Sequence, residues 1–168
     1  RALSRNAAAG EEPREQVEVA AFPHVVLARA FPAVRALPDL AASAGEGVVN
    51  APAILTERLD KSATCQAGTP PHVVNLSLLP HTPEDLDMIE RVLGHGTLTI
   101  LSRGYGNCRI TSTATPHVWR VRYFNSMDTL ILDTIEVTEV PEVACAAQED
   151  LADSAERRSE EHTPNSSH

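Results

Sequence analysis

The most distinctive chemical feature of the chain is a turn-like stretch from Arg103 to Asn107, in which two glycines flank a tyrosine. The glycines permit a backbone with positive φ, so the stretch is typical of a hairpin turn. Guanidinium, phenol and amide groups side by side are also enriched where proteins recognise one another. The segment therefore predicts either a plain turn or a turn that also binds a partner.

Arginines continue this pattern into the strands that follow. Trp119, Val121 and Tyr123 alternate with Arg120 and Arg122, which predicts that the arginines lie on the opposite strand face and point to solvent. The arginines either pair with carboxylates of neighbouring strands or form a basic face for a partner's carboxylates. Those neighbouring carboxylates are Asp128, Asp133, Glu136 and Glu139. The candidate partner-binding residues are Arg103, Gly104, Tyr105, Gly106, Asn107, Arg109, Arg120 and Arg122.

Cysteine chemistry offers a second hypothesis. Cys65, Cys108 and Cys145 are odd in number and lack a Cys-x-x-Cys spacing, so neither a closed disulfide framework nor a zinc knuckle is predicted. Unpaired cysteines of this kind suit a reducing cytoplasm. Cys108 is interpreted either as a small buried hydrophobe or as a thiol that works with His117 and a carboxylate in a metal- or thiol-handling enzyme. No metal or other cofactor is predicted.

Composition restricts the possible classes of function. The chain has 168 residues, a net charge of −9 and 42% hydrophobic residues, which is enough to bury a core. Phosphate backbones repel an acidic chain, so nucleic-acid binding is not expected. No apolar run approaches the roughly 18 residues that span a bilayer, so membrane insertion is not expected either. The first residues are not followed by the apolar segment of a secretory signal.

One helix and several strands can be placed from local signals. Thr82 is a cap, Pro83 takes the first helical position and Gly94 ends the helix, which predicts a helix over 83–93. The strands are predicted over 73–76, 97–100, 108–114, 118–124 and 129–137, and their short connections favour antiparallel pairing. The expected fold class is α+β: an antiparallel four- to five-stranded meander sheet with helices packed on one face. The 83–93 helix is expected to cover the Trp119 face.

Four segments make up the predicted domain organisation. Residues 1–22 are expected to be a disordered lead, because they show no sustained amphipathic period. Residues 23–72 are expected to form a short helical, proline-rich segment and a linker, with a helix near 52–59 capped by Asn50. Residues 73–158 form the α+β domain, and residues 159–168 form a polar tail.

Several sequence blocks occur in order across residues 73–158, and together they resemble the C-terminal conserved region of the hydrogenase expression and formation proteins called HupH or HyaF. The blocks are Leu79-Pro80, Leu93-Gly94-His95-Gly96, Ser102 to Ile110, His117-Val118-Trp119, Tyr123 to Ser126, Pro141 to Ala144 and Glu149 to Arg157.

The resemblance implies a cytoplasmic, chaperone-like accessory protein in the maturation of [NiFe] uptake hydrogenase, without an enzymatic activity of its own. It further implies binding to the iron–sulfur small-subunit precursor before export, and to other hydrogenase maturation proteins. The turn at 103–109 and the adjacent sheet face are the surface that we expect to make this contact. The alternative is the metal- or thiol-handling enzyme of the same pathway that uses Cys108 and His117.

Overall fold

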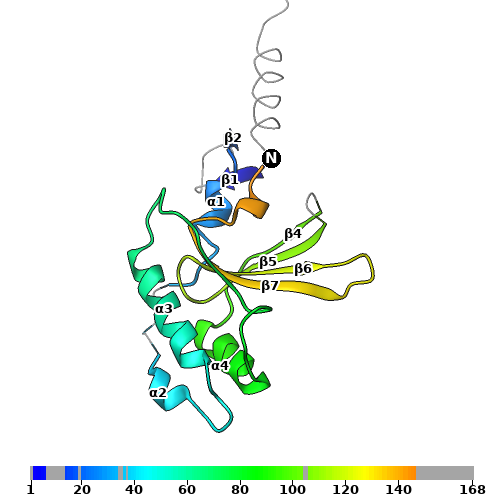
Figure 1. Ribbon diagram of the computed structural model, residues 1–168. Helices are drawn as coiled ribbons and strands as arrows, with labels where there is room; N and C mark the ends of the chain where they lie inside the picture. Colours follow the sequence, from blue (N-terminus) through cyan, green and yellow to red (C-terminus); the bar gives the residue numbers. More distant parts are fainter. Residues whose placement is uncertain are drawn as a thin grey trace, which may run out of the picture. The chain divides into compact units, whose positions relative to one another are not determined.

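The computed structural model describes residues 20–33, 36, 38–103 and 106–146, together with the backbone of residues 2–6 and 14–18 (Figure 1). The chain divides into two compact units, one formed by residues 1–28 and 145–168 and the other by residues 29–144.

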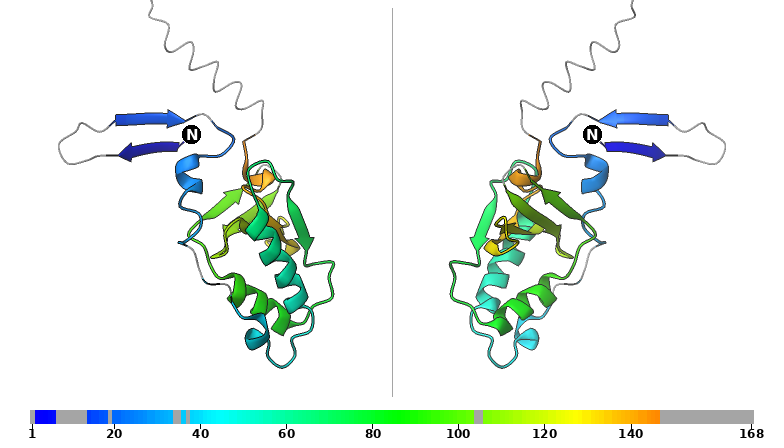
Figure 2. Two further views of the ribbon diagram at one scale, coloured as in Figure 1. Left: turned by 90° about the vertical axis from the view of Figure 1, so that its left-hand side faces the viewer. Right: turned by 90° about the vertical axis from the view of Figure 1, so that its right-hand side faces the viewer.

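The first unit contains a hairpin of β1 (Ala2–Asn6) and β2 (Arg14–Glu18), which Figure 2 shows in blue, and the short helix α1 (His24–Leu27). The two strands pair antiparallel, with Leu3 opposite Val17. The sequence predicted a disordered lead here, and the structure differs because main-chain pairing over five residues needs no sustained amphipathic period.

The second unit is built on an antiparallel five-stranded sheet. Its strands are β3 (His72–Asn75), β4 (Thr99–Ser102), β5 (Asn107–Ser112), β6 (Val118–Phe124) and β7 (Leu130–Val137). Their order is β3-β7-β6-β5-β4, so the last four strands form a meander and β3 pairs with the outer side of β7. The predicted α+β class with an antiparallel meander is confirmed.

The helices of this unit are α2 (Leu40–Ser43), α3 (Ala51–Thr64) and α4 (Pro83–Leu93), followed by the 3-10 turn η1 (Glu142–Ala144). Helix α4 has the predicted bounds, because the Thr82 hydroxyl accepts a hydrogen bond from Asp85 N and Gly94 adopts a φ of 67°. Helix α3 is longer than expected, and Asn50 makes no side-chain cap there.

The helices pack on one face of the sheet, but not on the face that the sequence predicted. Val118, Ile135 and Val137 join the buried cluster formed with α3 and α4. Trp119 follows Val118 directly in an extended strand, so it points to the opposite face. The expectation that the 83–93 helix covers Trp119 is therefore wrong. This helix-covered face is also the face of β6 that carries Arg120 and Arg122. The described helices pack at the end of it where Val118, Ile135 and Val137 lie.

A second, smaller layer buries Trp119 from the other side. The Phe31 ring meets the Trp119 ring edge-on at a centroid distance of 5.0 Å. The indole Nε1 donates a hydrogen bond of 3.1 Å to the Thr138 carbonyl oxygen. Trp119 is fully buried, as a core residue should be. Two segments therefore contact Trp119 on this face. Phe31 comes from the proline-rich segment that precedes the sheet in sequence, and Thr138 directly follows β7.

Asp85 fastens the two long helices together. Its Oδ1 accepts hydrogen bonds from the backbone N–H groups of Val49, Asn50 and Ala51 at 2.8, 2.9 and 2.8 Å. Its Oδ2 accepts one from Thr82 N at 3.0 Å. One buried carboxylate thus caps the start of α3 while it completes the first turn of α4.

Candidate partner-binding site

The sheet extends beyond its helical cover at the end where the β4–β5 and β6–β7 turns lie (Figure 1). At this end Leu101, Leu130 and Ile131 are 67%, 46% and 60% exposed. The register shifts between Tyr123 and Phe124, and this shift leaves Ile131 without a partner on β6. We call the exposed region here the distal sheet surface. It consists of Leu101, Arg103, Arg109, Phe124, Leu130 and Ile131.

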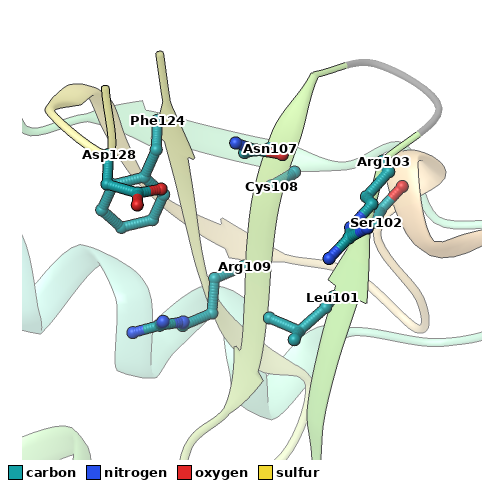
Figure 3. A pocket seen from close by; sticks show the side chains of 8 residues that line it. All are labelled: Leu101, Ser102, Arg103, Asn107, Cys108, Arg109, Phe124 and Asp128. Atoms are coloured by element: carbon teal, nitrogen blue, oxygen red, sulfur yellow. The ribbon is translucent and has the colours of Figure 1, made fainter. Parts of the chain in front are cut away.

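A concavity of about 410 Å³ lies within this region (Figure 3). The Arg109 guanidinium stacks over the Phe124 ring, 5.6 Å from its centroid, so the cation is oriented by a neighbouring strand. Leu101 lies directly opposite Arg109 on β4, which sets an apolar side chain beside the cation. The concavity is lined by Leu101, Ser102, Arg103, Asn107, Cys108, Arg109, Phe124 and Asp128.

The structure brings half of the predicted site together here. Arg103, Asn107 and Arg109 line the concavity and are exposed. Gly106 has a φ of 92°, which fits the predicted glycine-dependent turn. Gly104 and Tyr105 lie outside the described residues. The turn is thus a hairpin connection that also carries side chains into a concave surface.

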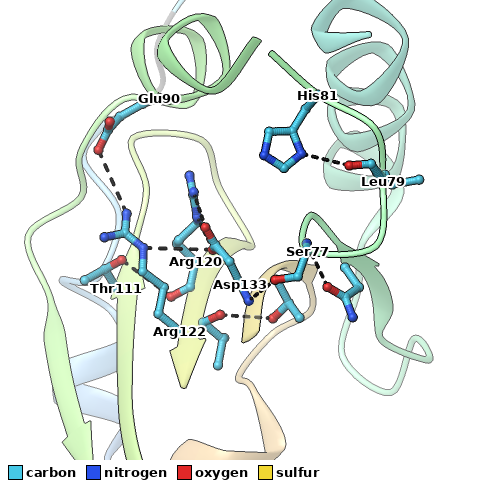
Figure 4. A network of polar contacts seen from close by, with 11 residues as sticks. Ser77, Leu79, His81, Glu90, Thr111, Arg120, Arg122 and Asp133 are labelled. Atoms are coloured by element: carbon cyan, nitrogen blue, oxygen red, sulfur yellow. Dashed lines mark hydrogen bonds and ion pairs between the residues drawn. The ribbon is translucent and has the colours of Figure 1, made fainter. Parts of the chain in front are cut away.

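Arg120 and Arg122 lie elsewhere, in a network of ion pairs near α4 (Figure 4). Arg120 binds both carboxylate oxygens of Asp133, at 2.6 and 2.5 Å, and its side chain is only 11% exposed. Arg122 lies 3.9 Å from Asp133 and 4.0 Å from Glu90 of α4. The expectation that both arginines face solvent is wrong for Arg120, which is largely buried on the face that carries the helices, whereas the Arg122 side chain is 32% exposed. Of the two interpretations that the sequence left open, pairing with a neighbouring strand describes Arg120.

Cys108 and His117 do not form the pair that the enzyme hypothesis requires. Cys108 lies opposite Tyr123, whereas His117 immediately precedes β6 at the other end of the hairpin. Six residues of extended chain separate these positions by about 20 Å, far beyond hydrogen-bond reach. Burial, and secondarily the charge of Glu136, raises the pKa of the Cys108 thiol, which disfavours the reactive thiolate.

Sequence reasoning missed the apolar half of the distal sheet surface. Leu130 and Ile131 belong to an apolar run that correctly predicts a central strand, because β7 pairs with both β3 and β6. Their exposure arises from a feature that the run does not encode, namely that this end of the strand extends past the helices. An isolated leucine such as Leu101 gives no signal at all.

Within the described part of the chain, no group of three His, Cys, Asp or Glu side chains could hold a metal ion. No helix there combines the length and apolarity needed to cross a membrane.

Comparisons with known proteins relate the chain to one family. The family model for the C-terminal conserved region of HupH hydrogenase expression protein matches residues 48–163. The hydrogenase expression/formation protein HupH of Rhodobacter capsulatus is 59% identical over 147 residues, which is 85% of this chain and 52% of that protein. The hydrogenase expression/formation protein HupQ of Azotobacter chroococcum mcd 1 is 53% identical over 150 residues, which is 88% of this chain and 52% of that protein.

A solved structure is similar as well. The hydrogenase expression protein HupH from Thiobacillus denitrificans ATCC 25259 superposes with a TM-score of 0.57 at 27% identity, over 67% of this chain and 93% of that chain. The match at 48–163 begins before the predicted domain start at residue 73 and so takes in α3. The chain spans about half the length of the curated relatives it matches. It belongs to the HupH family of hydrogenase expression proteins, in which its residues 48–163 correspond to the C-terminal conserved region.

Proposed function

We propose that the chain is a non-catalytic accessory module of hydrogenase maturation that binds a hydrogenase component through the distal sheet surface. The partner that we favour is the iron–sulfur small-subunit precursor, held in a chaperone-like complex in the cytoplasm before export. The support at the level of family is that the relatives are named hydrogenase expression/formation proteins.

One structural observation carries the proposal. Apolar side chains at 46% to 67% exposure surround two arginines on a rigid sheet, with a concavity between them. Exposed aliphatic groups beside an oriented guanidinium are characteristic of recognition surfaces. Clustered apolar side chains in contact with water also mark sites where a protein binds a partner. The ion pairs of Arg120 hold the neighbouring strands in register and so help to keep this surface preorganised.

Non-catalytic binding is also favoured over the enzyme alternative. A thiol whose pKa is raised and which lacks a histidine within reach is a poor nucleophile. The arginines of the distal sheet surface offer charge and hydrogen-bond donors, which suit binding more than proton transfer.

Co-purification tests the proposal. The tagged full chain, expressed with the small-subunit precursor, should capture it, and Arg103→Ala combined with Arg109→Ala should reduce capture at least about tenfold. Arg91→Ala is the matched control, because Arg91 is an exposed arginine in the last turn of α4. Equal capture by all three chains would place the contact on another surface. Capture of other maturation proteins in its place would contradict the named partner.

A further inference from the structure

We propose that the free edge of β4 accepts an extended, acidic segment of the partner as an additional antiparallel or parallel strand, next to the arginine-lined concavity. The inference rests on the proposed function and specifies how the same surface would hold its partner. Strand addition supplies main-chain hydrogen bonds for affinity, while the neighbouring side chains select the sequence that is added.

The hydrogen-bonding pattern shows which backbone groups of β4 are available. Ser112 N donates a 3.0 Å hydrogen bond to Leu98 O, and bonded pairs alternate along an antiparallel ladder. Ile100 and Ser102 therefore bond to β5, whereas Thr99 and Leu101 direct their N–H and C=O groups away from it. β4 is an outermost strand, and no other described residue is hydrogen-bonded to these outward groups.

The edge already accepts main-chain partners immediately before β4. Thr97 N donates to Ala30 O at 3.3 Å, and the Thr97 hydroxyl donates to Arg29 O. Among the described residues, no further hydrogen bond extends this contact along β4. A partner strand would continue the same line of hydrogen bonds along Thr99 and Leu101.

Natural sheets normally protect an edge strand with charge, proline or a covering loop. Leu101 instead leaves a large aliphatic side chain 67% exposed in the middle of the β4 edge. The opposite edge strand, β3, also exposes an apolar side chain, Val73, at 50%. It contains no arginine, however, and His72 at its start is paired with Glu57 at 2.7 Å. The β4 edge is thus the one that combines open backbone groups with a recognition surface.

Charge indicates the chemistry of the added segment. Arg103 and Arg109 line the concavity with one carboxylate, Asp128, and neither arginine forms an ion pair with a described residue. Alternate side chains of an added strand would point to this face, where a glutamate or aspartate would lie nearest to Arg103, which directly follows β4. The Arg109 guanidinium lies farther in, over Phe124 of β6. A second copy of the chain fits less well, because pairing two β4 edges would bring two arginine-lined concavities together.

Residue-resolved amide hydrogen exchange on the full chain is the direct test. The probe is a ten-residue peptide that alternates glutamate and valine, and its control alternates lysine and valine. We expect the glutamate peptide to slow exchange of the Thr99 and Leu101 amides at least tenfold, with Ile100 and Ser102 unchanged because they already bond to β5. No protection at millimolar peptide, or equal protection by the lysine peptide, overturns the inference.

A proline substitution isolates the main-chain contribution. Leu101→Pro removes an N–H that points to solvent, so the β4–β5 ladder stays intact, whereas Leu101→Ala removes the side chain and keeps the N–H. We expect the proline variant to lose protection and the alanine variant to retain it within a few-fold. Unchanged Trp119 fluorescence reports intact folding, and Thr99→Pro serves if the first variant unfolds.

The outcomes separate the two proposals. If Leu101→Pro captures the precursor as well as the wild-type chain while the double arginine variant does not, strand addition is wrong and the proposed function stands. If the double arginine variant still captures the precursor, the distal sheet surface is not the binding site and both fail. A third outcome is that the Thr99 and Leu101 amides are protected without peptide, and more strongly at higher protein concentration. The strand that pairs with β4 is then a second copy of the chain, and the inference of an acidic partner segment is wrong.

Discussion

Asp85 provides the sharpest test of how the helical layer is held together. Burial acts to raise the pKa of this carboxyl, but backbone hydrogen bonds from Ala51, Thr82, Val49 and Asn50 outweigh it and lower the pKa from 3.8 to about 2. The folded state therefore favours the ionised form. At about 1.4 kcal/mol per pH unit, the difference corresponds to roughly 2 kcal/mol of stability.

The sign of the pH dependence follows from the direction of that shift. A carboxyl whose folded pKa lies below its unfolded value stabilises the protein fully above the unfolded pKa of 3.8. The contribution is lost as the pH falls from about 5 toward the folded pKa of about 2, where the unfolded state is protonated and the folded state is half protonated. Stability at neutral pH should thus exceed that at pH 2 by about 2 kcal/mol from this group alone.

Asp85→Asn removes the charge while it retains nearly the same volume. The amide oxygen can still accept from the start of α3, but the amide nitrogen replaces the oxygen that accepts from Thr82 N, so two donors face each other. An unsatisfied buried donor costs about 1–3 kcal/mol. With the lost charge–dipole attraction, we expect the free energy of unfolding at pH 7 to fall by about 2–4 kcal/mol.

Urea unfolding measured by fluorescence reports this change directly, because Trp119 is the only tryptophan and lies in the same compact unit. The gap between the wild-type chain and Asp85→Asn should narrow by about 2 kcal/mol between pH 7 and pH 2.5. Asp87→Asn, at an exposed position of the same helix, is the matched control and should change stability by less than about 0.5 kcal/mol. A gap that is below 1 kcal/mol at pH 7, or that does not vary with pH, would refute the account of Asp85 as the joint between α3 and α4.

Two further predictions concern the sheet. A Cβ on Gly96 would lie 2.2 Å from the Ser112 hydroxyl oxygen and 2.6 Å from the Thr113 carbonyl oxygen, at the end of β5. Gly96→Ala should therefore lower the free energy of unfolding by at least about 2 kcal/mol. Gly45→Ala is the control: its Cβ would meet no atom within 4 Å, so its thermal melting should be unchanged. Asp133→Asn would leave the largely buried guanidinium of Arg120 without its counter-ion and should cost about 3–5 kcal/mol in urea unfolding. Asp128→Asn, on an exposed turn, is its control, and equal losses for the two variants would contradict the role given to the ion pair.

Local signals predicted individual elements well. Thr82, Pro83 and Gly94 gave the correct bounds of α4 because a cap, a first-turn proline and a positive-φ stop all act within a few residues of the helix. Strand β6 also has its predicted bounds, since strict alternation of side chains is itself a local property. Elements of this kind need no knowledge of the rest of the fold.

Contacts between distant residues are what the sequence did not reveal. Asn50 precedes α3 and matches the cap preference, yet its side chain makes no cap hydrogen bond. Asp85, which lies 34 residues from Ala51, accepts from backbone N–H groups at the start of the helix. Asn50 uses its amide instead to donate to Pro80 O at 2.8 Å. The backbone N–H groups at the start of α3 are thus satisfied by a carboxylate from another helix, a contact that no local sequence signal reveals.

The same argument explains the candidate site. Alternation along β6 separates Trp119 from Arg120, but it does not say which side a helix will cover, and here each side is buried by a different part of the chain. Helices that stop short of the hairpin turns divide the arginine-bearing face into two parts. Near α4 the arginines are neutralised by Asp133 and Glu90. Beyond it the Arg109 guanidinium lies over the Phe124 ring and forms no ion pair with a residue that the structure describes. The length of the helical layer relative to the strands therefore decides which of four similar arginines remain available to a partner.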